Sequence, residues 1–178
     1  MARAGRSIAG CACLATCLVA CAGPAACARF ERFALTSPAF AAGGPIPARF
    51  TCRGAGPSPP LAWTAPPAGT LSLAVEAVDP DASVRGGFTH WLGWGIPPRE
   101  QMLPVGGRAP VSGANDAGGR GYTGPCPPSG VHHYHFTLYA LDLRRLPLRA
   151  GAGRSEFERA LRGHVLARAT LVGTFAAG

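Results

Sequence analysis

A rigid loop near the middle of the chain leads directly into a segment that carries histidine and tyrosine side chains. The loop reads Y-T-G-P-C-P-P-S-G, and its prolines and glycines exclude both a helix and a central strand. The next residues, V-H-H-Y-H-F-T-L-Y, are aromatic or β-branched and alternate with period two, which predicts a strand. On that strand His132 and Tyr134 share the apolar face, whereas His133 and His135 share the other. An imidazole and a phenol on an apolar face indicate one wall of a small polar pocket.

Two further predicted strands carry polar groups that could complete this pocket. The alternation of residues 71–79 places Asp79 at the end of an apolar strand face, and Asp81 follows after a proline that ends the strand. A carboxylate on an apolar face is costly unless it is paired or hydrogen-bonded, so Asp79 should have a polar partner. In residues 89–96, His90 is predicted to lie in phase with three apolar side chains, Leu92, Trp94 and Ile96.

The motifs around these residues occur in a recognisable order. D-P-D-A-S begins at Asp79, T-H-W contains His90, and G-P-C-P-P-S-G-V-H-H-Y ends at Tyr134. Together with further motifs over nearly all of residues 33–175, they resemble the phosphatidylethanolamine-binding protein family, in particular its bacterial branch, usually labelled Raf-kinase-inhibitor-like. The resemblance implies an anion-binding pocket. Its ligand-binding residues would be Asp79, Asp81, His90, Pro127, Ser129, Gly130, His132 and Tyr134.

The resemblance implies that the pocket takes a phosphate-bearing head group, such as that of a phospholipid, or a similar small anion, without a cofactor. Imidazoles, the tyrosine hydroxyl and backbone N–H groups near Ser129 can all donate to phosphate oxygens. The carboxylates are expected to orient the rings and to favour their charged form. Three positions depart from the family pattern, namely Arg53, Ser83 and His133. At His133 an always-charged arginine is replaced by a titratable ring, which bears on ligand preference.

Other interpretations of these residues give different functions. Ser129, His132 and Asp79 could be drawn as a hydrolase triad, but the loop lacks the strand–turn–helix elbow of such enzymes. His133 and His135 form an H-x-H pair that could bind a metal, but no third ligand is evident and an exposed strand face is preferred. A structural envelope protein with a vestigial pocket is a further alternative. We expect a binding protein rather than an enzyme, with inhibition of a partner enzyme as an added role that the resemblance implies.

Composition argues against a nucleic-acid-binding protein. The chain has 178 residues and a formal net charge of +8, and all of its basic residues other than histidine are arginines. These arginines are scattered singly, apart from the adjacent Arg144 and Arg145, and do not form the basic stripe that nucleic acid requires. The length suits a targeting segment followed by one domain.

Residues 1–28 have the pattern of an export signal, and residues 29–178 are expected to form the single domain. Two arginines precede an apolar run that is too short for a membrane span, and A-C-A at residues 26–28 offers a cleavage site. L-V-A-C ending at Cys21 also resembles the bacterial lipoprotein signal, in which this cysteine would carry the lipid. The protein is therefore expected in the periplasm, or anchored to the envelope by lipid, with no transmembrane span after processing.

Cys52 and Cys126 are the only cysteines outside the targeting segment. In the family pattern their segments lead into and out of the pocket region, and export permits oxidation, so the two are candidates for a disulfide. The alternative is two small, buried, reduced residues.

The remaining sequence predicts a mainly β fold, a sandwich of antiparallel sheets with a few short helices, as the family resemblance also implies. Strands are expected at residues 33–40, 48–52, 61–64, 71–79, 89–96 and 165–175, besides the one after residue 130. Residues 97–116 are expected to be mostly irregular. One helix is expected near the C-terminus, with Ser155 as its N-cap and Glu156 in its first turn.

Overall fold

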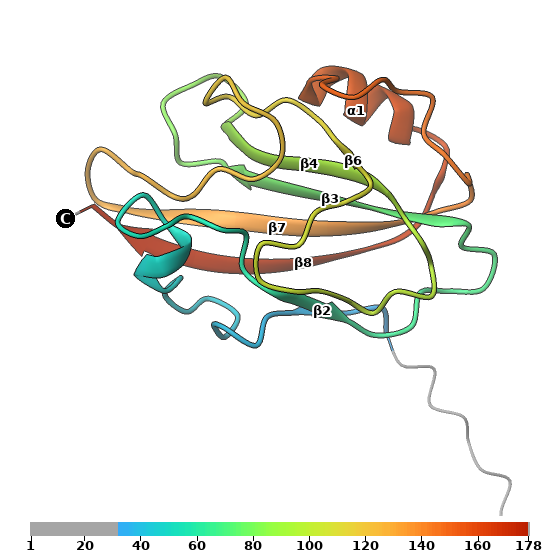
Figure 1. The fold of residues 1–178 in the computed structure, drawn as a ribbon, viewed down its shortest axis with the longest axis horizontal. Coiled ribbons are helices and arrows are strands. Elements are labelled where there is room, and N and C mark those ends of the chain that lie inside the picture. The colour runs from blue at the N-terminus through green and yellow to red at the C-terminus, as the bar shows by residue number, and fades with distance from the viewer. Residues whose placement is uncertain (1–31, 178) are drawn as a thin grey trace, which may run out of the picture. The chain divides into compact units, whose positions relative to one another are not determined.

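The computed structural model describes residues 32–177, which form two antiparallel sheets and one α-helix (Figure 1). The large sheet has the strand order β6-β4-β3-β7-β8, and the small sheet has the order β1-β2-β5. The strands of the large sheet are β3 (Ser72–Asp79), β4 (Phe88–Ile96), β6 (Val111–Ser112), β7 (Val131–Leu141) and β8 (Val165–Ala176). The small sheet contains β1 (Leu35–Thr36), β2 (Leu61–Trp63) and β5 (Met102–Leu103). The predicted sandwich with one helix near the C-terminus is confirmed.

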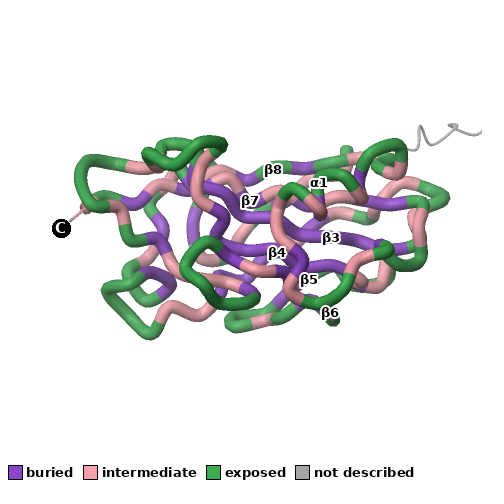
Figure 2. The backbone as a smooth tube through the Cα atoms, turned by 90° about the horizontal axis from the view of Figure 1, so that it is seen from above, coloured by how far each residue is buried: buried purple, intermediate pink, exposed green. Residues whose placement is uncertain are grey.

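Both faces of the large sheet are covered. One core lies between the sheets and includes Leu61, Val75 and Phe136, and the other lies beneath helix α1 (Arg154–Leu161) and includes Trp94 and Phe157. Strand β3 is therefore buried along its whole length (Figure 2). Burying apolar side chains on both faces is the main favourable contribution to this fold.

Strand β7 follows the predicted period. Its burial alternates from Tyr134 to Ala140, with Tyr134, Phe136, Leu138 and Ala140 buried and the intervening residues more accessible. The strand pairs with β3 on one side and with β8 on the other. The long registered pairing fixes the positions of His132 and Tyr134 relative to Asp79, because β3 ends beside the start of β7.

The predicted phase of His90 with Leu92, Trp94 and Ile96 is wrong. In the pairing of β4 with β3, Ala77 faces Trp91 and Val78 faces Thr89, so His90 is the extra residue of a β-bulge. The bulge places His90 towards Tyr134, on the side of the core between the sheets, while Leu92 and Trp94 pack under the helix. A second irregularity, near Gly95 with its φ of 79°, returns Ile96 to the first side.

Several predicted element types and boundaries are corrected. Residues 48–52 do not form a strand: Ala48–Phe50 is a 3₁₀ helix that follows Pro47, whose fixed φ suits a helix start. Ser155 is not the N-cap of α1, because the helix is capped by Gly153, whose N–H donates to the Glu156 carboxylate at 3.0 Å. The irregular stretch of residues 97–116 contains the two short strands β5 and β6.

Helix α1 is tied to the large sheet by a buried carboxylate. The Glu76 side chain accepts hydrogen bonds from the Tyr139 hydroxyl at 2.7 Å and from Nε of Arg154 at 3.0 Å. Burial and the neighbouring carboxylate raise the pKa of Tyr139, which keeps its hydroxyl protonated as the donor. No helix within residues 32–177 is long and apolar enough to cross a membrane.

Candidate functional site

A pocket of about 540 Å³ opens where the ends of β3, β4 and β7 meet the proline-rich loop. In Figure 1 this loop precedes β7 and lies at the same end of the sheet as the C-terminus. Six of the eight predicted ligand-binding residues line the pocket, namely Asp79, Asp81, His90, Pro127, Ser129 and His132. Gly130 does not line it, although its φ of 67° shapes the turn into β7.

Asp79 organises one wall of the pocket. Its Oδ1 accepts hydrogen bonds from the backbone N–H of Asp81 at 2.9 Å and of Ala82 at 3.2 Å. Its Oδ2 accepts a hydrogen bond from Nδ1 of His132 at 2.7 Å. Asp79 is only 3% exposed, and these three donors satisfy the buried carboxylate as the sequence required. Since Nδ1 of His132 is engaged, Nε2 is the ring nitrogen left to meet a ligand.

His90 is held in the same way by a different acceptor. Its Nδ1 donates to the backbone carbonyl of Thr123 at 2.9 Å, and the ring lies against Phe88 and edge-on to Tyr134. Burial lowers the pKa of His90, and the hydrogen bond to Thr123 and the charge of Asp79 oppose this effect only in part. The charge of Asp79 thus favours the charged ring as expected, but for His90 the net shift has the opposite direction, because desolvation outweighs it.

Tyr134 lies behind the pocket rather than in its wall. Its side chain is 1% exposed, and its hydroxyl finds no hydrogen-bond partner of good geometry within residues 32–177. Burial, followed by the nearby charge of Asp79, raises the pKa of Tyr134, so the hydroxyl stays a donor. A buried hydroxyl without a hydrogen-bond partner is costly, so a ligand or water molecule that accepts a hydrogen bond from Tyr134 would be stabilised there.

Asp81 pairs with His133 rather than with the pocket histidines. Both the backbone N–H and Nδ1 of His133 donate to Oδ2 of Asp81, each at 2.7 Å. These two hydrogen bonds lower the pKa of Asp81. His133 therefore contacts a pocket-lining carboxylate even though its strand face points away from the core. The sequence placed His133 on the correct face but missed this contact, because strand phase does not show how far the neighbouring loop reaches.

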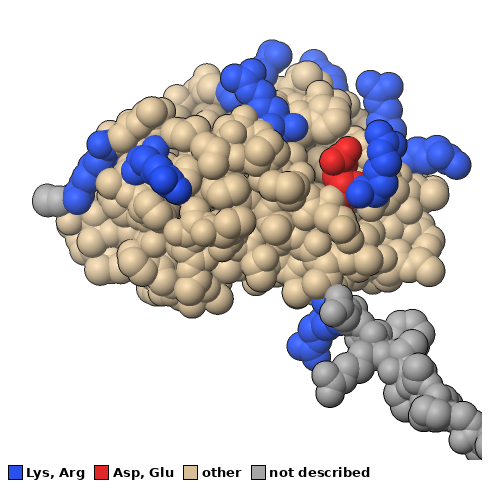
Figure 3. Space-filling view, turned by 60° about the horizontal axis from the view of Figure 1, so that its bottom comes forward, with Lys and Arg blue, Asp and Glu red and all other residues tan. Residues whose placement is uncertain are grey.

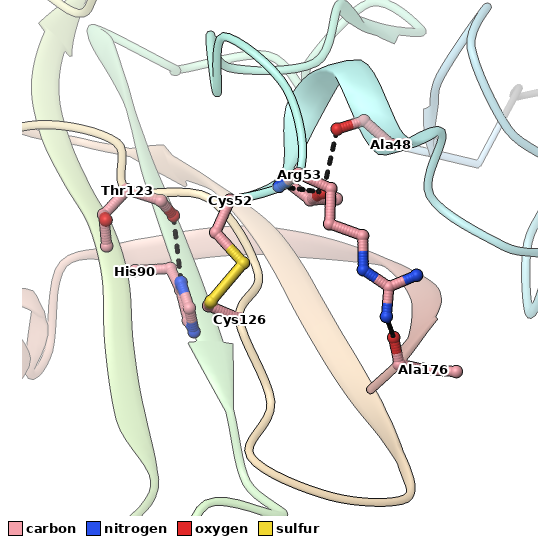
Figure 4. The surroundings of a disulfide bond; sticks show 8 residues. Ala48, Cys52, Arg53, His90, Thr123, Cys126 and Ala176 are labelled. Atoms are coloured by element: carbon pink, nitrogen blue, oxygen red, sulfur yellow. Dashed lines mark hydrogen bonds between the residues drawn. A yellow bond between two sulfur atoms is a disulfide. The ribbon is translucent and has the colours of Figure 1, made fainter. Parts of the chain in front are cut away.

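The pocket loop is tied to the 3₁₀ helix that follows β1. Cys52 and Cys126 are joined in a disulfide (Figure 4), with 5.4 Å between their Cα atoms. The N–H of Cys52 also donates to the Pro125 carbonyl. In the same view, the Nδ1 of His90 points to Thr123 just before Cys126 along this loop. Gly124 allows the approach, because a Cβ there would lie 2.9 Å from the backbone of Thr51. The loop that orients His90 is therefore held at several points.

The hydrolase and metal interpretations find no geometric support in the part of the chain that the structure describes. The hydrogen bond from Nδ1 of His132 to Asp79 is one that a triad would also use, but Ser129 is exposed and no hydrogen bond joins its hydroxyl to His132. Among residues 32–177, no group of three histidine, cysteine or acidic side chains could hold a metal ion.

Four pocket features were missed by sequence reasoning. Phe88 stacks on His90, the Thr123 carbonyl fixes its tautomer, Ala117 lines the pocket, and Asp116 adds a nearby negative charge. A backbone carbonyl gives no sequence signal, because any residue type could supply it. Asp116 ends the stretch of residues 97–116, which was expected only to be mostly irregular, and the sequence did not single it out as a pocket residue.

Basic side chains occupy several separate places on one face of the molecule. Figure 3 shows this face, on which uncharged surface lies between groups of arginines and the group at one end lies beside acidic side-chain atoms. Such a distribution gives no continuous basic stripe on that face, in agreement with the composition.

The family model for phosphatidylethanolamine-binding protein matches residues 36–176. A UPF0098 protein of Methanothermobacter thermautotrophicus is 46% identical over 151 residues, covering 81% of this chain and 99% of the relative. A Mycobacterium tuberculosis protein named as lipoprotein LppC is 43% identical over 152 residues, covering 82% of this chain and 73% of the relative. The structure of the phosphatidylethanolamine-binding protein homologue CT736 from Chlamydia trachomatis superposes with a TM-score of 0.78 at 39% identity, covering 83% of this chain and 99% of CT736.

Proposed function

This chain belongs to the phosphatidylethanolamine-binding protein family, and we propose that it is a binding protein whose pocket takes a small anion such as a phosphodiester head group. The observation that carries the proposal is the matched arrangement of two histidines. His90 and His132 both line the pocket, and each donates through Nδ1 to a fixed protein acceptor. Nε2 of each ring therefore remains for the ligand.

The protonation state of these rings sets the chemistry of binding. A neutral ring that already donates through Nδ1 presents a lone pair at Nε2, which repels an anionic oxygen. A protonated ring presents an N–H donor instead, and a hydrogen bond from a charged ring to an anion contributes about 1.5–3 kcal/mol. Binding of an anion that carries no proton of its own should therefore draw a proton onto the pocket.

A titration of the protein with glycerophosphoethanolamine by calorimetry tests the proposal. We expect His132→Ala to weaken binding by about 10- to 150-fold, the range that corresponds to 1.5–3 kcal/mol. His135→Ala is the matched control, because His135 lies on the same strand but lines a separate cavity beside Glu76 and Arg154. Equal affinities for the two variants would contradict the proposed pocket.

A turnover assay alongside the titration separates binding from hydrolysis. If the protein turned over a generic ester, and Ser129→Ala abolished that turnover while binding persisted, the hydrolase alternative would be favoured. The exposed position of Ser129 and its lack of a hydrogen bond with His132 support the binding function instead.

We further propose that the protein is exported and held at the envelope by lipid on Cys21. Support comes from the signal-like segment and from the relative named as a lipoprotein. Cys21 itself lies outside the described residues. Fractionation of the native host tests this: the mature protein should sediment with membranes, and Cys21→Ala should release it or block its processing. A mature N-terminus at residue 29 in the soluble fraction would exclude the anchor.

A further inference from the structure

A second cleft, of about 420 Å³, lies beside the segment that borders the anion pocket. Gly121 and Tyr122 line this cleft, whereas the next residues, Thr123 and Gly124, line the anion pocket. The other lining residues are Gly56, Pro57, Ser58, Trp91, Gly106, Gly107, Arg108, Ser112 and Arg120. We call it the arginine cleft. Among the described residues, none lines both the arginine cleft and the anion pocket.

Two aromatic rings that line the arginine cleft are held rigidly. Trp91 and Tyr122 meet edge to face, with 5.7 Å between ring centroids and an interplanar angle of 77°. The Tyr122 hydroxyl donates to the Phe50 carbonyl at 2.9 Å, so it is not available to a ligand. Burial raises the pKa of Tyr122, which keeps that donor protonated. Trp91 is only 1% exposed, so the fixed apolar surface open to a ligand is that of the partly exposed Tyr122 ring, which Trp91 holds in place.

The cationic side chains of the cleft come from two different loops and face no acid there. No aspartate or glutamate lines the cleft, and neither Arg108 nor Arg120 forms an ion pair with an acid among the described residues. Arg120 is also placed by its neighbours. Its guanidinium packs against Gly151, where a Cβ would lie 3.0 Å from Nε. The backbone beside it is fixed by a hydrogen bond from the N–H of Gly121 to the Gly113 carbonyl.

Small residues keep the cleft open. Gly106 and Gly121 both have positive φ, at 69° and 79°, so these turns favour glycine. A Cβ at Gly121 would reach within 3.6 Å of the Ser112 hydroxyl, and one at Gly106 within 3.8 Å of Pro57. Both glycines line the cleft, so side chains at these positions would narrow it.

We propose that the arginine cleft is a second binding site, specific for an organic anion that joins a carboxylate or phosphate group to an apolar body. The guanidinium groups match the bidentate geometry of a carboxylate or phosphate. The apolar body packs on the ring of Tyr122, which the buried Trp91 supports by its edge-to-face contact. The two arginines gain the acidic partner that the fold does not supply. This site is separate from the anion pocket and stands whether or not that pocket binds a head group.

The experiment is a titration of the full-length chain with phenyl phosphate, followed by the indole N–H signals in ¹H–¹⁵N NMR spectra. The chain has 3 tryptophans, so the signals are few. Trp63 donates its indole N–H to the Glu100 carbonyl and Trp94 lies under the helix, so only Trp91 should move. Because His90 precedes Trp91, the His132→Gln variant serves as the control that impairs only the anion pocket.

We expect the Trp91 signal to shift with saturation in the wild type and equally in His132→Gln. In the double variant Arg108→Gln and Arg120→Gln the apparent affinity should fall at least about tenfold, with the other indole signals unchanged as evidence of an intact fold. Inorganic phosphate should bind more weakly than phenyl phosphate, because it lacks the apolar body. An unchanged affinity for phenyl phosphate in the double arginine variant, or loss of the Trp91 shift in His132→Gln, would overturn the proposal of a second site. Equal affinity for the two probes would overturn the role of the aromatic pair.

Discussion

The disulfide between Cys52 and Cys126 should make a large contribution to stability, and replacing both cysteines by serine measures it. The bond closes a loop with a sequence separation of 74. A cross-link stabilises mainly by reducing the conformational entropy of the unfolded chain. For a loop of this length the chain-entropy relation gives about 4.5 kcal/mol at room temperature. A domain of this size loses roughly 2–4 °C of Tm per kcal/mol, so the double variant should melt about 10–18 °C lower.

The fold itself should survive the loss of the bond. The same two segments are also joined by the hydrogen bond from Cys52 N–H to the Pro125 carbonyl and by that from the Tyr122 hydroxyl to Phe50. The unfolding free energy of the double serine variant should therefore fall without a change in the native circular dichroism spectrum. The slope of free energy against urea should change little, or rise slightly as the unfolded chain expands.

Urea unfolding of the oxidised wild type, the wild type with reductant and the double variant provides the comparison. A non-reducing peptide map first establishes whether a peptide links the two cysteines. Reduced wild type and double variant should have similar midpoints, both well below that of the oxidised protein. Free thiols at both positions in protein isolated without reductant, or equal midpoints for all three samples, would refute the reasoning.

Three further predictions concern other parts of the fold. Gly173→Ala should cost about 1–3 kcal/mol, because a Cβ there would lie 2.7 Å from core side chains, whereas Gly153→Ala meets no atom within 4 Å and should cost only about 0.5–1 kcal/mol of urea stability, the effect of alanine at the N-cap of α1. Arg154→Met should cost about 1–3 kcal/mol in thermal unfolding by removing a partner of the buried Glu76 carboxylate, and an unchanged Tm would argue against that tie. The pKa of Asp81 is lower in the folded protein than its ordinary value of 3.8. The ionised carboxylate therefore slightly stabilises the folded state at pH values above 3.8, and this stabilisation is lost as the pH falls through the lowered pKa. The unfolding free energy of Asp81→Asn should thus fall less than that of the wild type between about pH 5 and 3. Parallel curves of unfolding free energy against pH for the two proteins would contradict this.

The sequence predicted the strands that follow a simple period and not the positions where that period breaks. Strand β7 was predicted on both faces, because its alternation runs without interruption from Tyr134 to Ala140. Strand β4 was predicted as a strand but with the wrong faces, because a bulge at His90 and another irregularity near Gly95 reverse the phase twice. Only pairing with β3 shows where a bulge lies, and that is a tertiary property.

The candidate site divides in a similar way. Side chains such as Asp79, Asp81, His90 and His132 could be named from the sequence because their motifs resemble a known family, and all four line one pocket. The direction of the His90 pKa shift could not be predicted, because it depends on how deeply the ring is buried. The contact between Asp81 and His133 also depends on the path of the turn after β3.

Proton uptake on anion binding is the most direct test of the proposed pocket. Because burial lowers the pKa of His90, that ring should be neutral near pH 7 in the free protein and should gain a proton when an anion binds. Sulfate is a suitable probe, since it does not titrate in this range. Calorimetry in two buffers of different ionisation enthalpy measures the uptake.

The account predicts net uptake near pH 7 that diminishes as the pH falls through the lowered pKa of His90, with affinity rising as the pH falls and with both effects reduced in His90→Gln. Sulfate binding without proton uptake at pH 7, with an affinity independent of pH, would contradict the assignment of His90 and His132 as the anion donors.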